Sequence, residues 1–122
     1  METFIRFIIS NFTLTFFIIG MVWAGLIVLL RSGPLTKSIV IDRFFAYYLL
    51  FPIGVGFLYN FVMHVFFGDL AAKFIGWSQS PFQAEVGFAS LGFAVVAIIA
   101  FSKDISFRAA AVIGPAFFFW GV

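Results

Sequence analysis

The chain contains no cysteine and a single histidine. Without a thiol it can form no disulfide framework, no thiolate metal site and no cysteine nucleophile. Charge is scarce as well, because charged residues make up only 10% of the 122 residues, whereas soluble domains average about 25%. So few charged groups cannot cover the surface of a soluble globule. The composition therefore excludes a cytosolic enzyme, a disordered segment and a nucleic-acid-binding protein.

Apolar residues dominate the composition. They make up 64% of the chain, and 21 residues are phenylalanine. A spanning helix needs about 20 apolar residues, so this length suits one domain with three to five spans. We find no internal repeat. The sequence predicts an all-α fold, a polytopic membrane helix bundle that forms a single domain over residues 1–122.

Four apolar runs are long enough to be candidate spans, at about 7–30, 44–67, 81–101 and 105–122. The first is too long for the apolar core of a signal peptide, so we expect an uncleaved helix. The last meets the end of the chain without a polar flank. Either its tip lies at the far interface, or the natural chain continues past Val122.

Local signals mark where two of these helices begin. Ser80 precedes Pro81 and stands three residues before Gln83, which is the pattern of a capping box with proline at the first helical position. Asp104 can cap the last helix in the same way. It is also spaced four residues from Arg108, which predicts an ion pair along that helix.

The connection at 68–80 is the least apolar part of the second half of the chain. Asp69 can cap a short helix that Gly76 then ends. Such a helix is too short to span, so we expect it to lie in the interface with Trp77 as a headgroup-level anchor. The rival interpretation is a shallow re-entrant dip, which is tolerated only where neighbouring helices bury its backbone.

Basic residues indicate the orientation. In a four-span topology five of the seven face one side of the membrane: Arg31, Lys37, Arg43, Lys103 and Arg108. Only Arg6 and Lys73 face the other side. The positive-inside rule then places the two basic loops in the cytoplasm and the N-terminus outside.

A stripe of small and polar residues runs along the second span, where His64, Asn60, Gly56 and Pro52 follow one another in steps of four. This stripe is expected to pack on other helices, with Gly56 allowing close approach and Asn60 hydrogen-bonding across the contact. Pro52 is expected to kink the helix. A kink can serve as a transport hinge, although plain packing is the commoner role.

Two more faces carry small residues. Glu85 shares a helix face with Ala89 and Gly92, which predicts a contact face on the third span. Gly20 and Ala24 form a small-xxx-small pair on the first span. We expect both faces to pack against helices rather than lipid.

His64 and Glu85 lie at similar depths, because one span ends and the next begins at the same side of the membrane. Ionisable groups inside a span are functional candidates by default. Three interpretations stay open: a structural hydrogen bond that joins helices, a proton-accepting pair, and part of a metal site with oxygen and nitrogen ligands. The candidate polar site comprises His64, Glu85, Asn60, Asp69, Lys73 and Gln83.

Residues 76–87 read GWSQSPFQAEVG, and His64 lies ahead of them. This stretch resembles a family of small prokaryotic membrane proteins of unknown function with an IGW-x-x-SPFQ-x-E-x-G signature. The resemblance implies an integral membrane fold of four or more helices in the prokaryotic cytoplasmic membrane. It implies no activity and no cofactor. The positions it marks as characteristic are His64, Trp77, Pro81, Gln83 and Glu85.

The leading functional hypothesis is a non-enzymatic membrane protein, a small accessory or interaction subunit. Its partners would be the lipid bilayer and either copies of itself or a larger membrane complex. The alternative is a small proton- or cation-handling transporter or channel-like protein that uses Glu85 and His64. A quinone- or lipid-linked membrane enzyme is third. No cofactor or metal ligand set is identified by these patterns.

Overall fold

The computed structural model describes residues 1–121, and that part of the chain is all-helical with no strand. Its elements in chain order are α1 (Glu2–Ser10), α2 (Phe12–Leu30), α3 (Lys37–Tyr48), the π-helical segment η1 (Leu49–Val55), α4 (Gly56–Phe66), α5 (Gly68–Ile75), α6 (Phe82–Ala100) and α7 (Ile105–Gly121). The expected all-α bundle is confirmed. Val122, the tip of the predicted last span, lies outside the described residues.

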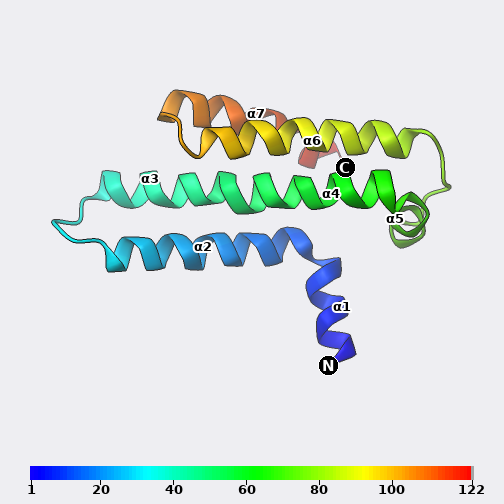
Figure 1. Ribbon diagram of the computed structural model, residues 1–122, viewed down its shortest axis with the longest axis horizontal. Coiled ribbons are helices and arrows are strands. Elements are labelled where there is room, and N and C mark those ends of the chain that lie inside the picture. Colours follow the sequence, from blue (N-terminus) through cyan, green and yellow to red (C-terminus); the bar gives the residue numbers. More distant parts are fainter. Residues whose placement is uncertain (122) are drawn as a thin grey trace.

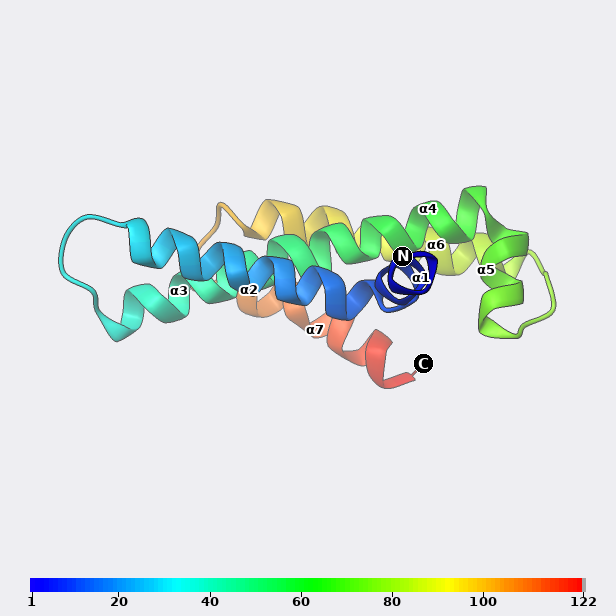
Figure 2. The ribbon, with the colours of Figure 1, turned by 90° about the horizontal axis from the view of Figure 1, so that it is seen from below.

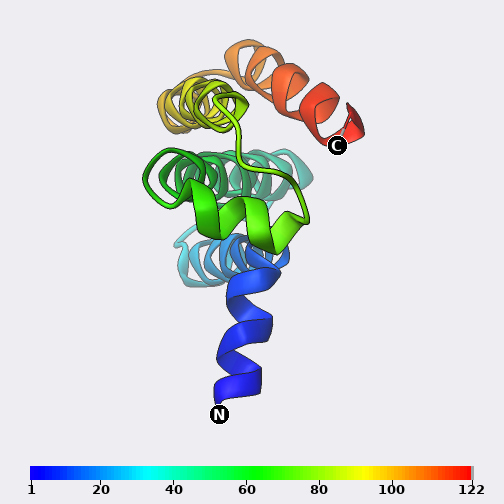
Figure 3. The same cartoon turned by 90° about the vertical axis from the view of Figure 1, so that its right-hand side faces the viewer.

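The long helices run antiparallel and side by side, in the order α2, the continuous α3–η1–α4 rod, α6 and α7 (Figure 1). Two ends result. The loops at 31–36 and 101–104 lie toward the same end, which we call the basic end. The helices α1 and α5 lie at the other, which we call the α5 end, and there α5 lies across the bundle axis (Figure 3).

Three helices are long and apolar enough to cross a membrane: Phe12–Leu30, Lys37–Phe66 and Phe82–Ala100. This makes the chain a membrane protein. The fourth apolar helix, Ile105–Gly121, has 17 residues and is shorter than these three. A fourth span therefore stays a prediction.

The predicted helix over 7–30 is broken at Asn11, so α1 turns away from α2 (Figures 1 and 2). Side chains bond to carbonyls at the break. Thr15 Oγ1 donates to Ile8 O at 3.0 Å, and Asn11 Nδ2 donates at 2.9 Å to Phe7 O, which also accepts from Asn11 N at 3.0 Å. Hydropathy averaged over the run cannot detect this break, because it depends on two polar side chains finding carbonyls.

The second long helix starts earlier than predicted, at Lys37 rather than near 44. Thr36 caps it, since its side chain accepts a hydrogen bond from Ile39 N at 3.2 Å. Pro52 lies inside the π-helical segment η1 within one continuous 30-residue helix. Proline has no N–H to donate, and the wider π turn accommodates that loss without ending the helix.

Small residues bring the helices together around η1. Leu49 and Ile53 are almost fully buried against Ala94 and Ala97 of α6. Gly20 of α2 approaches the same segment so closely that a Cβ there would lie 3.1 Å from Phe51 Cβ and from Tyr47 O. Large side chains of the central helix thus fill spaces left by alanine and glycine on its neighbours.

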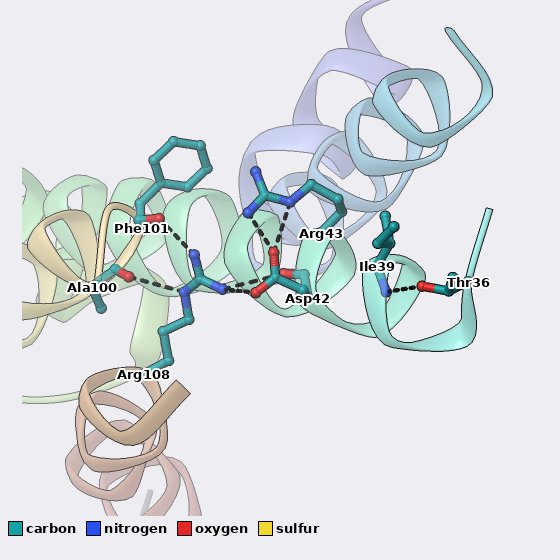
Figure 4. A network of polar contacts seen from close by, with 7 residues as sticks. All are labelled: Thr36, Ile39, Asp42, Arg43, Ala100, Phe101 and Arg108. Atoms are coloured by element: carbon teal, nitrogen blue, oxygen red, sulfur yellow. Dashed lines mark hydrogen bonds and ion pairs between the residues drawn. The ribbon is translucent and has the colours of Figure 1, made fainter. Parts of the chain in front are cut away.

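A polar cluster joins three helices at the basic end (Figure 4). Arg108 of α7 is 3% exposed and donates from Nη1 to Asp42 Oδ1 of α3 at 2.6 Å. It also donates to the last carbonyls of α6, from Nε to Ala100 O at 3.1 Å and from Nη2 to Phe101 O at 2.8 Å. Arg43 pairs with the same carboxylate of Asp42. The guanidinium of Arg108 therefore caps the C-terminus of α6 and links it to α3.

The predicted Asp104–Arg108 ion pair is wrong, because Arg108 turns to Asp42 instead. The predicted cap is confirmed, since Asp104 Oδ1 accepts from Phe107 N at 3.0 Å. A carboxylate that already caps its helix end leaves the arginine free to reach across the bundle.

Candidate functional site

His64 lies near the end of α4 and is 5% exposed. Its Nδ1 makes a short hydrogen bond with Gln83 Oε1 on α6. Because a carbonyl oxygen can only accept, Nδ1 carries the proton, and Nε2 is the acceptor in the neutral ring. With Nδ1 bonded to Gln83, Nε2 on the far side of the ring is left for another partner.

Gln83 is equally buried, at 4% exposed, and its Nε2 has no hydrogen-bond partner among residues 1–121. A buried amide N–H without a partner is energetically unfavourable in a folded protein. Gln83 also departs from its predicted role. No side-chain cap forms at the start of α6, so the predicted capping box at Ser80 is wrong, and the glutamine reaches His64 instead of its own helix end.

Asn60 lies one turn before His64 and hydrogen-bonds across the same helix pair. Its Nδ2 donates to Ser90 Oγ at 2.8 Å, and Ser90 Oγ donates in turn to Val86 O at 2.8 Å. Both His64 and Asn60 of the candidate set thus face α6. Their shared stripe on α4 packs against the helix carrying Gln83, Gly87 and Ser90.

The loop between α5 and α6 is closed by Gln79. Its Nε2 donates to Asp69 Oδ1 at 2.7 Å, while its Oε1 accepts from Ser80 N at 3.0 Å. Asp69 therefore holds the loop and makes no capping bond to α5, in contrast to the prediction. Gly76 ends α5 with a positive φ of 86°, as expected for a glycine stop. Trp77 follows, its ring 6.5 Å from the His64 ring.

Two cavities meet at His64. A polar cavity of about 340 Å³ lies between the end of α4 and the loop, and its wall includes Asp69, Gln79, Ser80 and Gln83. A larger cavity of about 460 Å³ lies between α1, α4 and α5, and most of its wall is apolar. His64 lines both. It thus contacts both a polar space and an apolar one.

Glu85 and Lys73 are not part of this cluster. Both are exposed, and neither makes a side-chain hydrogen bond or an ion pair within residues 1–121. Glu85 follows Gln83 by two residues, which turns it about 200° around the helix and away from His64. The structure therefore pairs His64 with Gln83, not with Glu85. Among residues 1–121 no group of three His, Cys, Asp or Glu side chains could hold a metal ion.

The residues predicted to pack helices divide into two groups. Gly20, Ala24 and Gly56 are buried inside the bundle. Ala89 and Gly92 are exposed, and a Cβ at Gly92 would meet nothing within 4 Å. The face of α6 that packs inside this chain is the opposite one. An interface at Ala89 and Gly92 therefore requires another molecule and stays a prediction.

Sequence reasoning missed Gly87 as a residue of the packed face of α6. A Cβ at Gly87 would lie 2.5 Å from Val65 Cγ2, so this glycine sets the approach of α6 to α4. Ser90 is fully buried and bonded to Asn60. Their spacing of three residues was the available signal, because Gly87, Ser90 and Ala94 share one helix face.

No curated protein and no solved structure matches this chain. A family model does, over residues 10–122, and its description is a family of unknown function, DUF6790. That match agrees with the expectation that the chain belongs to a family of unknown function. The signature expected over residues 76–87 stays a prediction. With nearly its whole length covered, the chain belongs to the DUF6790 family.

Proposed function

We propose that this membrane protein is a non-enzymatic interaction subunit that associates inside the bilayer through the outer face of α6. The observation that carries the proposal is the exposure of Glu85, Ala89 and Gly92 together on that face. Lipid-facing surfaces favour large apolar side chains. A strip with small residues and a carboxylate suits contact with another helix, because the backbones can approach and the charge can find a partner.

The two faces of α6 differ in a way that supports this. The inner face buries Gln83, Gly87, Ser90 and Ala94 against the chain's own helices. The outer face carries Ala89 and Gly92 among larger exposed side chains such as Phe88, and no element of residues 1–121 covers them. A helix that carries small residues on both faces is suited to packing on two sides. The partner is either a second copy or a different membrane protein.

The test uses a photoactivatable amino acid placed at Ala89 or Gly92 in native membranes. The control carries it at Val22 on α2, a residue that is 57% exposed. We expect a discrete protein adduct from the α6 positions only. An adduct of twice the chain mass identifies a second copy, and one of another mass identifies a different partner. Adducts at all three positions alike, or at none, would contradict the proposal.

A second candidate is proton handling at His64. It is favoured by one observation, that His64 lines both a polar and an apolar cavity. Proton flux in proteoliposomes should then be lost in His64→Gln and kept in Glu85→Gln. Equal flux in both variants and the unchanged protein would exclude this role.

A further inference from the structure

We propose that the apolar cavity at the α5 end binds an amphiphile made of an apolar chain and an anionic oxygen head. This inference does not rest on the association of α6, because the cavity lies between α1, α4 and α5. Its volume of about 460 Å³ falls within the ~300–1,000 Å³ of ordinary ligand cavities. A free fatty acid and an anionic phospholipid share this chemistry.

The apolar part of the wall comes from α1, α4, α5 and the first residue of α2. Three of its members are more than half exposed, Ile9 of α1 and Leu70 and Phe74 of α5. The break at Asn11 is what makes the space, since a straight continuation of α2 would not swing α1 away from the bundle (Figure 3). The apolar lining residues are Ile9, Phe12, Met63, Leu70, Ala71, Phe74 and Ile75.

The polar part of the wall offers mainly donors and contains no acidic residue. Arg6 supplies a guanidinium. Tyr59 supplies a hydroxyl that makes no side-chain hydrogen bond within residues 1–121, and its ring is held by Phe12 with the centroids 4.8 Å apart. His64 supplies Nε2, because Nδ1 is bonded to Gln83. One cation and two further hydrogen-bonding groups match a head with two acceptor oxygens.

His64 suits such a head through Nε2, because a ring that donates from both nitrogens binds Gln83 Oε1 at one and a carboxylate or phosphate oxygen at the other. Since His64 is 5% exposed, its place in the wall is built into the fold rather than a chance surface feature. A neutral alcohol head offers the guanidinium of Arg6 no charge to pair with.

Glu2 competes with the head of the ligand for the guanidinium of Arg6. Its Nη2 lies 2.9 Å from Glu2 Oε1, in an ion pair whose side chains are both 80% exposed. Exposed pairs of this kind contribute little, so an anionic head can replace the glutamate. This gives a directional expectation: removing Glu2 strengthens binding, whereas removing Arg6 weakens it.

The experiment reconstitutes the full chain in neutral-lipid nanodiscs and adds a diazirine-bearing fatty acid, phosphatidylglycerol or fatty alcohol of equal chain length. We expect one or both anionic probes to label α1, α4 and α5 peptides in a saturable way. Labelling by the fatty acid alone identifies the free acid as ligand, and labelling by the phospholipid identifies a bilayer lipid. Equal labelling by the alcohol would overturn the inference.

Matched variants separate the cavity from general lipid contact. Ile75→Trp fills the cavity and should abolish saturable labelling, whereas Leu58→Trp adds the same bulk at an exposed site of α4 outside the wall. Arg6→Gln should weaken binding about ten-fold, the loss of one charge-assisted hydrogen bond, and Glu2→Gln should strengthen it or leave it unchanged. Labelling that is unaffected by Ile75→Trp and Arg6→Gln would overturn the inference.

Discussion

Arg108 Nη1 lies 2.6 Å from Asp42 Oδ1, although 66 residues separate the two along the chain. The same guanidinium takes up carbonyls of Ala100 and Phe101, so α3, α6 and α7 are joined at one point (Figure 4). Asp42 is itself half-exposed and shared with Arg43. Arg108 is therefore the residue of this cluster that bonds to both α3 and the end of α6.

Replacing Arg108 by Ala should lower the free energy of unfolding by about 3 kcal/mol, because it leaves Asp42 Oδ1 and two carbonyls without their donor. Arg108→Lys should recover only part of that loss, since an ammonium cannot span the three acceptors. Unfolding in mixed detergent micelles measures both. Asp104→Asn is the control, and a loss as large as that of Arg108→Ala would contradict the observed pairing.

Gly87→Ala and Gly92→Ala form a matched pair on one helix. A Cβ at Gly87 would lie 2.5 Å from Val65 Cγ2, whereas a Cβ at Gly92 meets nothing within 4 Å. We expect Gly87→Ala to lower the free energy of unfolding by about 1–3 kcal/mol. Gly92→Ala should leave it unchanged or raise it slightly. Thermal unfolding of both purified variants decides this, and equal effects would contradict the assignment of faces.

The Asn60–Ser90 hydrogen bond is expected to couple α4 and α6 by about 0.6 kcal/mol, the average for such bonds inside membranes. A double-mutant cycle of Asn60→Leu and Ser90→Ala isolates this term. Both residues also pack, so each single substitution changes stability on its own. Additive effects in the double variant would show that the bond contributes nothing measurable.

The break at Asn11 gives a prediction about shape. Asn11→Leu with Thr15→Val removes the side-chain donor to Ile8 O and the second donor to Phe7 O. The backbone is then expected to satisfy Ile8 O itself, which continues α2 into α1. Because the chain has no cysteine, spin labels at Phe4→Cys and Leu70→Cys report the distance between α1 and α5. An unchanged distance distribution would show that packing, not these two side chains, holds the break.

Much of the fold was predictable from local patterns. Four apolar helices, the short helix before Gly76 and the Asp104 cap all follow from hydropathy and end signals that operate within a few residues. The misassigned features share a different origin. The capping box failed because Gln83 found His64 nineteen residues away, and the break at Asn11 depended on side chains reaching carbonyls of another turn.

By itself, then, the sequence determined the class of this protein. So few charges among so many apolar residues require a membrane, and the positions of those charges divide the chain into a basic end and an α5 end. The tertiary structure alone decided which groups meet. It turned Glu85 outward while Gln83 points to His64, and it joined Arg108 to Asp42 rather than to Asp104. The physical reason is that such pairings depend on how each helix is rotated against its neighbours, and the close packing of Gly20 and Gly87 sets that rotation.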